Sequence, residues 1–207
     1  MITVFGRASS INVRKVLWCC DELALSIQRE DWGKGFQSPR TPAFLELNPN
    51  GQVPVIRDGD FVLWESNAIL RYLANRYSSD SCYPSEARQR ALVDQWMDWQ
   101  ATSLNNAGDY AFMALIRNSP DHTQSSELAV SVANWNAHIG ILNRHLATTG
   151  AYVAGAHFTI ADISIGMAVN RWLSTPLGHP DYFHVNAYFK RLSERTGFFS
   201  HCNNGIP

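Results

Sequence analysis

Asn48–Val55 reads NPNGQVPV, and the segment Trp64–Asn67, WESN, begins nine residues after it. Because proline neither donates to a strand ladder nor continues a helix, the Val53–Pro54 pair between a turn and a strand predicts a bend whose backbone can hold a ligand. Glu65 and Ser66 then open a helix, where free N–H groups and the positive end of the dipole attract a carboxylate. The two segments predict half of a binding site for a small, peptide-like anion.

The segments around this stretch predict a small α/β domain. Short apolar runs bounded by turn residues predict strands, and apolar residues at helical spacing predict helices. The first two strands, joined by a helix, should be parallel with a right-handed crossover. In that helix, Arg14 and Lys15 fall on the face opposite the apolar stripe, which predicts that they are exposed. The expected elements are a strand at 1–5, a helix at 13–24, a strand at 27–32, a short helix at 43–47, strands at 54–57 and 61–64 joined by a hairpin turn at 58–60, and a helix at 66–77.

The rest of the chain predicts a second, all-helical domain. Residues 79–85 are rich in serine and contain a proline, so we place a linker there, between domains at 1–78 and 86–207. Breaks between the helices of the second domain are expected near 119–120, 150, 176 and 179–180.

One helix of the second domain has a strong start signal, Phe158–Ile163, FTIADI. Thr159 and Asp162 have the spacing of a capping box, and Phe158 and Ile163 occupy the positions of the flanking hydrophobic staple. The pattern therefore predicts a capping role for Asp162 rather than that of a catalytic acid.

Composition and charge exclude several classes of protein. With 17 Lys and Arg against 18 Asp and Glu, the formal net charge of -1 gives no electrostatic reason to expect nucleic acid or an anionic membrane. The first residues lack the basic and apolar regions of a signal peptide, and no apolar run has the length of a membrane span, so a cytoplasmic location is expected. The cysteines show no metal-ligand spacing; we expect no metal, no disulfide framework and a packing role for Cys19 and Cys20.

The loop Arg7–Asn12, RASSIN, lies between the first strand and the first helix, where ligands bind in open α/β sheets. A serine hydroxyl here can donate to a bound thiolate and lower the pKa of the thiol. The alternative is that Ser9, Ser10 and Asn12 only cap the helix, and spacing alone favours this alternative. The sequence has no GxSxG, GxGxxG or Walker-type motif that offers another site.

Four segments carry a family resemblance: SSINVRKV, NPNGQVPV, LWESNAILRYLA and FTIADIS. In this order and spacing they resemble the cytosolic glutathione transferases, and the opening segment is most similar to bacterial theta-like and dehalogenating members. The resemblance covers nearly the whole chain. It implies a thioredoxin-like N-terminal domain, an all-helical C-terminal domain and the activity of a glutathione transferase, with glutathione as co-substrate.

The resemblance also implies which residues hold glutathione. Pro54 is expected to be a cis-proline, so that Val53 presents its backbone to the cysteinyl part of the tripeptide. Glu65 and Ser66 match the pair that binds the γ-glutamyl end, with Ser66 at its carboxylate and Glu65 at its ammonium group.

Near this site, Gln52 departs from the family pattern, and Arg40 is the residue that can compensate for it. Gln52 stands where relatives often carry lysine, and it can hydrogen-bond but cannot supply charge. Arg40 falls where relatives contact the glycyl carboxylate. Arg40 either replaces the missing charge or is a solvated loop residue.

For the contact to the thiolate, the resemblance favours Ser10. It lies four residues before Arg14, as the catalytic serine of theta- and delta-like members lies four before a basic residue. Ser9 is adjacent to it, and Asn12 occupies a position where many relatives have proline. Both are therefore kept as alternative contacts.

The leading interpretation is a glutathione transferase that conjugates activated glutathione to small electrophiles, with haloacid-like substrates as one version. The first alternative is a glutathione-dependent disulfide oxidoreductase or isomerase, which Asn12 in place of proline leaves open. The second is a non-catalytic glutathione-binding or protein-interaction module. The resemblance also implies a homodimer. It places the second substrate, which Arg117 can attract if it is anionic, near the helical residues Trp96, Trp99, Tyr110, Phe112 and Met113.

Overall fold

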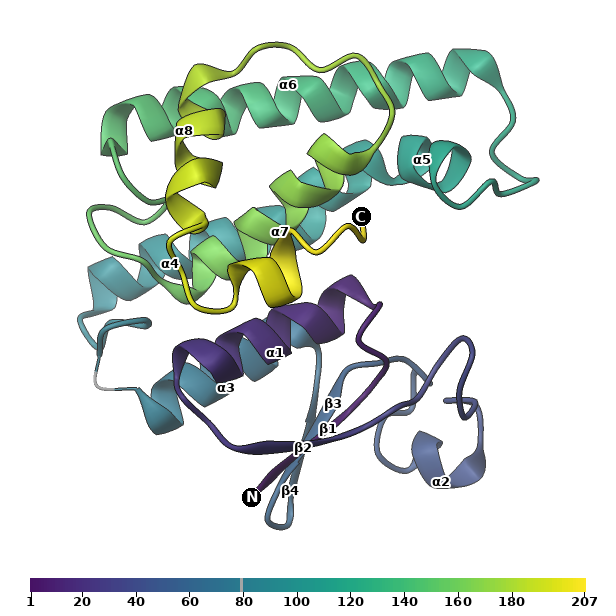
Figure 1. Ribbon diagram of the computed structural model, residues 1–207, viewed down its shortest axis with the longest axis vertical. Helices are drawn as coiled ribbons and strands as arrows, with labels where there is room; N and C mark the ends of the chain where they lie inside the picture. Colours follow the sequence, from purple (N-terminus) through teal and green to yellow (C-terminus); the bar gives the residue numbers. More distant parts are fainter. Residues whose placement is uncertain (79) are drawn as a thin grey trace. The chain divides into compact units, whose positions relative to one another are not determined.

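The computed structural model describes residues 1–78 and 80–207, which form two compact units (Figure 1). The first unit combines Met1–Tyr83 with Thr196–Asn204, and the second combines Pro84–Arg195 with Gly205–Pro207. The sequence pattern gave no sign that residues near the C-terminus return to the first unit.

The first unit is a four-stranded sheet covered by helices. Its strands lie in the order β2-β1-β3-β4; β1 and β2 are parallel, and the other neighbouring pairs are antiparallel. This confirms the predicted parallel βαβ unit and the hairpin. The elements are β1 (Ile2–Phe5), α1 (Ile11–Glu22), β2 (Ile27–Glu30), α2 (Pro42–Leu45), β3 (Val55–Asp58), β4 (Phe61–Trp64), α3 (Ser66–Tyr77) and the π-helix η2 (Phe198–Cys202). The fold is thioredoxin-like, with α1 and α3 packed side by side (Figure 1).

A small apolar cluster anchors the segment that carries Val53. Phe5 of β1, Phe44 of α2 and Val55 of β3 are buried together, and Val53 and Trp32 pack against them. The ring centroids of Trp32 and Phe44 are 4.8 Å apart. Because α2 has only four residues, tertiary packing of Phe44 must hold it in place. The cluster thereby fixes the chain between α2 and β3.

Helix α1 is buried on more than one face, and here the sequence prediction was wrong. Arg14 and Lys15, expected to be exposed, are 0% and 2% exposed. Arg14 Nη1 donates to Asn204 Oδ1 at 3.0 Å, and Lys15 Nζ donates to Asn67 Oδ1 at 3.4 Å. The apolar stripe identified one packed face, but α3 and η2 also pack on α1 and bury its basic residues.

The segment Thr196–Asn204 packs closely on α1. A Cβ atom at Gly197 would lie 2.3 Å from Trp18 Cδ1, so the backbone approaches the indole as only glycine allows. Phe198 meets the same indole edge to face, with ring centroids 6.0 Å apart. The C-terminal segment is therefore part of the core around α1.

The second unit is built of helices. They are α4 (Ala87–Trp99), the π-helix η1 (Gln100–Leu104), α5 (Asn105–Leu115), α6 (Ser125–Thr149), α7 (Ile160–Ser174) and α8 (Phe183–Leu192). The breaks expected from sequence fall between these helices. The linker expected at 79–85 begins at Ser79, which lies outside the described residues. Among the residues that are described, none forms a helix with the length and apolarity needed to cross a membrane.

The start of α7 is held by the predicted capping box. The Thr159 N–H donates to Asp162 Oδ2 at 2.8 Å, while the Val153 N–H and the Tyr188 hydroxyl donate to Oδ1 at 2.9 and 3.0 Å. Burial raises the pKa of Asp162 to about 6, although these hydrogen bonds act to lower it. The carboxylate is occupied by structural donors, so the capping interpretation is confirmed.

Cys19, Cys20, Cys82 and Cys202 are free thiols. Burial raises the pKa of the Cys19 thiol, and it raises the pKa of Cys20 to about 12. The thiolate is the reactive form, so neither side chain is a nucleophile near neutral pH. Both cysteines pack in the buried part of α1, as predicted.

Candidate functional site

The Val53–Pro54 peptide bond is cis, as the family resemblance implies. Asn48 holds the turn that precedes it, because its Nδ2 donates to the Gln52 carbonyl at 2.8 Å and its Oδ1 accepts the Asn50 N–H at 3.0 Å. Among residues 1–78 and 80–207, no backbone group bonds to the N–H or C=O of Val53. Both groups can therefore bond to an extended peptide lying alongside.

Glu65 and Ser66 form the start of α3. Glu65 is exposed, with φ of 73° and ψ of 111°, a conformation that bulky side chains rarely adopt. Such conformations cost on the order of 1–3 kcal/mol and concentrate at binding sites. Ser66 is 6% exposed, and its hydroxyl donates to Asn12 Oδ1 at 3.3 Å. The structure thus joins the start of α3 to the start of α1.

The loop between β1 and α1 lies against Val53. Gly6 has φ of 148°, and a Cβ atom there would lie 3.0 Å from Val53 Cβ and 2.5 Å from Val13 Cγ2. Only glycine permits both this φ and this approach. The contact brings the serine loop and the cis-proline loop together, although more than forty residues of sequence separate them.

The three candidates for the thiolate contact have different surroundings. Ser9 Oγ accepts a hydrogen bond from Arg7 Nη1 at 2.8 Å, and Asn12 Oδ1 accepts the one from Ser66. Ser10 is the N-cap residue of α1, but its side chain makes no capping hydrogen bond. The capping interpretation favoured by spacing is therefore wrong for Ser10. Its half-buried hydroxyl is not committed to the helix end.

Arg40 lies beside the turn that leads to the cis-proline. A Cβ atom at Gly51 would be 2.9 Å from Arg40 Cδ and 3.2 Å from its Nε, which shows how closely the arginine stem crosses this glycine. The side chain of Gln52 is exposed next to it. The structure thus brings Arg40 and Gln52 to the same turn, directly before Val53 in the sequence.

Sequence reasoning missed two residues that shape this site. Asn48 fixes the turn, and its place at the head of NPNG was a usable signal because Asn side chains often bond their own backbone in turns. Arg7 holds Ser9. A single arginine in a polar loop carries no comparable signal, since its partner depends on how the loop folds.

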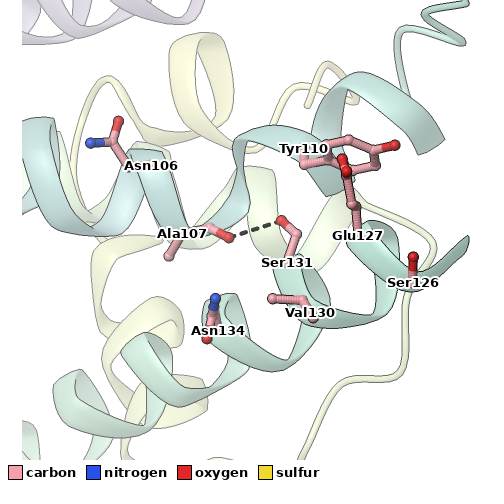
Figure 2. Close-up of a pocket in the computed structure, with 8 residues that line it drawn as sticks. All are labelled: Asn106, Ala107, Tyr110, Ser126, Glu127, Val130, Ser131 and Asn134. Carbon is pink, nitrogen blue, oxygen red and sulfur yellow. Dashed lines mark hydrogen bonds between the residues drawn. The ribbon is translucent and has the colours of Figure 1, made fainter. Parts of the chain in front are cut away.

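The second unit, where the sequence predicts the site of a second substrate, has two hollows among its described residues. The larger, about 350 Å³, lies between α5 and α6 (Figure 2). It is lined by Asn106, Ala107, Tyr110, Ser126, Glu127, Val130, Ser131 and Asn134. Ser131 is occupied, since its hydroxyl donates to the Ala107 carbonyl at 2.9 Å. The one charged side chain in this lining, Glu127, makes it unfavourable for an anion.

The smaller hollow, about 120 Å³, is lined by Leu104, Asn105, Gly108, Asp109, Phe112, Trp135, Ala168 and Arg171. The guanidinium carbon of Arg171 lies 4.2 Å from the centre of the Phe112 ring. Arg117, the cation expected from sequence, lies 5.2 Å from the same ring centre. Of the aromatic residues expected near the substrate, Tyr110 lines the larger hollow, Phe112 lines the smaller one, and Trp96 is buried.

A thioredoxin-like unit with a cis-proline loop, combined with a helical unit whose α7 begins at a capping box, defines a two-domain class of protein. The family described as "Glutathione S-transferase, N-terminal domain" matches residues 1–75. The family described as "Glutathione S-transferase, C-terminal domain" matches residues 113–191.

Individual relatives agree with these matches. The chain is 34% identical over 197 residues to the glutathione S-transferase GstB of Escherichia coli strain K12, covering 94% of each chain. The theta class glutathione S-transferase of Xanthomonas axonopodis pv. citri, solved with glutathione bound, has a TM-score of 0.89 and 34% identity over 97% of this chain and 96% of that chain. A rice elongation factor 1-gamma is 33% identical over 80% of this chain, which spans 40% of that protein. The chain belongs to the glutathione S-transferase family, near its bacterial theta-like members.

Proposed function

We propose that the protein binds reduced glutathione in its first unit, activates the thiol with Ser10 and conjugates the sulfur to small electrophiles. The thiol proton leaves to solvent, a carbon–sulfur bond forms, and the leaving group departs with the electron pair of the bond it breaks. The observation that carries this proposal is the Ser10 hydroxyl. It lies at the start of α1, in the loop that contacts Val53, and makes no capping hydrogen bond.

Each part of glutathione has a proposed partner. The backbone of Val53, beside cis-Pro54, pairs with the cysteinyl residue. Ser66 and the free N–H groups at the start of α3 bind the γ-glutamyl carboxylate, and the exposed Glu65 faces the ammonium group. Arg40 and Gln52 bind the glycyl end. This arrangement is supported by the contacts that join the serine loop to Val53 and to Ser66.

Ser10 is proposed to donate its hydroxyl hydrogen to the thiolate. Such a bond favours the ionised form, and each pKa unit of lowering corresponds to about 1.4 kcal/mol. A lower pKa raises the fraction of thiolate near neutral pH. Ser9 is proposed as a second donor, and Asn12 as the residue that orients Ser66.

For the electrophile, we propose short haloacids. The support is the smaller hollow, where the guanidinium of Arg171 lies over Phe112 and the lining holds this cation as well as the carboxylate of Asp109, whereas Glu127 is the one charged side chain lining the larger hollow. Paired substrates test this: an α-haloacid and the corresponding α-haloamide, which has nearly the same shape but no charge. Arg171→Gln should raise the KM for the acid about tenfold and leave the KM for the amide unchanged. Equal effects on both substrates would reject the charge-based selection.

A direct assay tests the reaction itself. Purified protein is incubated with glutathione and the haloacid, and thioether and halide are measured in equal amounts. A parallel assay supplies a glutathione mixed disulfide in place of the haloacid. Turnover of the disulfide alone would replace the proposal with the oxidoreductase alternative, and binding of glutathione without either turnover would replace it with the non-catalytic module.

A homodimer and a cytoplasmic location are also proposed, on the support of the family alone. Light scattering at working concentration tests the first, since a mass near that of one 23.2 kDa chain would reject it.

A further inference from the structure

We infer that Arg7 is a positioning residue for the thiol-activating loop: it holds Ser9 and provides a fixed positive charge that favours the thiolate of bound glutathione. This inference rests on the proposed function. It adds a residue for which neither the sequence pattern nor the family resemblance gave a role.

The first support is the contact between Arg7 and Ser9. Arg7 Nη1 donates to Ser9 Oγ at 2.8 Å, in a half-buried setting. A guanidinium group carries only donors and stays charged, so Ser9 must use its oxygen as the acceptor. The single hydrogen of the Ser9 hydroxyl is then left to donate elsewhere. A donor polarised by a neighbouring cation makes a stronger hydrogen bond to an anion.

The second support is the way in which Arg7 is fixed. Its N–H donates to the Trp32 carbonyl at 3.0 Å, and its carbonyl accepts the Ser10 N–H at 3.1 Å. Its side chain crosses Gly33, where a Cβ atom would lie 3.3 Å from Arg7 Nε and 3.4 Å from Cδ. Gly33 also has φ of 107°, which favours glycine. Hydrogen bonds thus fix the Arg7 backbone, Gly33 leaves room for the side chain to cross it, and the guanidinium is placed beside Ser9.

The third support is the distribution of charge. Glutathione in its thiolate form carries two carboxylates and one ammonium group besides the sulfur, so the site must accommodate a net charge of about −2 at neutral pH. Arg14 bonds to Asn204, Lys15 bonds to Asn67, and Arg40 lies at the Gly51 turn. The side chain of Arg7 is the basic group that contacts Ser9. Within the part of the chain that the structure describes, Arg7 forms no ion pair with a carboxylate.

A positive charge near a thiol lowers the pKa of that thiol because it favours the charged form. Arg7 thus acts in two ways on the same group. It turns the Ser9 hydrogen away from itself, and its charge attracts the sulfur anion. Both effects should be lost when the guanidinium is replaced by a neutral side chain of similar length.

The test is the thiol pKa of bound glutathione, read from the ultraviolet absorbance of the thiolate in the intact protein. Arg7→Gln should raise this pKa by about one unit, a tenfold loss of thiolate at a pH below both values. Arg29→Gln is the matched control, because it removes the same charge from β2, where Arg29 pairs with Asp31 at 3.3 Å. The control should leave the thiol pKa at the parent value.

A double-mutant cycle asks whether Arg7 works through Ser9. If it does, the shifts of Arg7→Gln and Ser9→Ala do not add, and the double variant shows little more than the larger single shift. Arg7→Lys should show a smaller shift than Arg7→Gln, since it keeps the charge but loses the planar fork. A purely structural role would lower the melting temperature and leave the pKa of bound glutathione unchanged.

The outcomes separate this inference from the proposed function. A parent thiol pKa equal to that of free glutathione would overturn the proposed function and this inference with it. A raised pKa in Ser10→Ala but an unchanged one in Arg7→Gln would overturn only the role of Arg7. If Arg7→Gln does not fold, Ser9→Ala decides, and an unchanged thiol pKa in that variant overturns the inference.

Discussion

The hydroxyl of Ser66 donates to Oδ1 of Asn12 at 3.3 Å, although 54 positions separate the two residues in sequence. Asn12 lies in the first turn of α1, and Ser66 is the first residue of α3. The bond therefore joins the N-terminal ends of two helices. Since the positive ends of both dipoles meet there, the junction favours an anion.

Removing this bond should weaken glutathione binding. Asn12→Ala leaves the Ser66 hydroxyl without the partner that orients it, and we expect a loss of about 1 kcal/mol, roughly fivefold in Kd. Isothermal titration calorimetry measures the change. Asn203→Ala, at an exposed position of the same unit, serves as the control and should bind like the parent. Equal affinity of Asn12→Ala and the parent would argue against the role of the junction.

The contact between the serine loop and Val53 depends on Gly6. Gly6→Ala combines an unfavourable φ with a Cβ atom 2.5 Å from Val13, so it should destabilise the fold by about 2–4 kcal/mol and weaken glutathione binding. Gly59→Ala has a φ of 64°, but among the described residues other than its chain neighbours none places an atom within 4 Å of the new Cβ, and it should cost about 1 kcal/mol. Urea unfolding measures both. A similar loss in the two variants would mean that φ, and not the close approach to Val13 and Val53, explains the glycine.

Asp162 should give the stability of the protein a distinctive pH dependence. Burial raises the pKa of Asp162 from 3.8 to about 6, so the folded state binds the proton at a higher pH than the unfolded state does. The stability from this group is fully present below about pH 4 and is lost as the pH rises through about 6. Asp162→Asn, which does not titrate, lacks this loss.

The measurement is the free energy of unfolding across pH 4 to 7 in the parent and in Asp162→Asn. The difference between the two proteins should change by about 2–3 kcal/mol over this range. Asp181→Asn, which replaces an exposed carboxylate, controls for general charge effects and should follow the parent. Parallel curves for the parent and Asp162→Asn would refute the assigned titration.

The elements of this fold were predictable where the signal is local. The spacing of apolar residues and the turn residues between them located the βαβ unit and the hairpin. The spacing of Thr159 and Asp162 located the start of α7. The burial of Arg14 was not predictable, because its partner Asn204 lies 190 positions away. Amphipathic patterning reports one packed face and says nothing of a distant segment that covers another.

The candidate site shows the same division. Val53 and Ser66 could be proposed as site residues from motifs, because each motif reflects a local backbone requirement. The hydrogen bonds of the serine hydroxyls could not be predicted in this way, since capping propensity describes an average helix start. Ser9 is engaged by Arg7, which is only two positions away, but the place of Arg7 depends on its contacts with Trp32 and Gly33, which are tertiary.

The central claim is that Ser10 activates the thiol of glutathione. The most direct measurement is the ultraviolet titration of bound glutathione in the parent, in Ser10→Ala and in Ser200→Ala, an exposed serine of the same unit. Because the Ser10 side chain makes no capping bond, its removal should leave the melting temperature nearly unchanged. We predict a thiol pKa below the ordinary value of about 8.5 in the parent and in Ser200→Ala, and a rise of about one to two units in Ser10→Ala. A lowered pKa that stays the same in Ser10→Ala would contradict the claim.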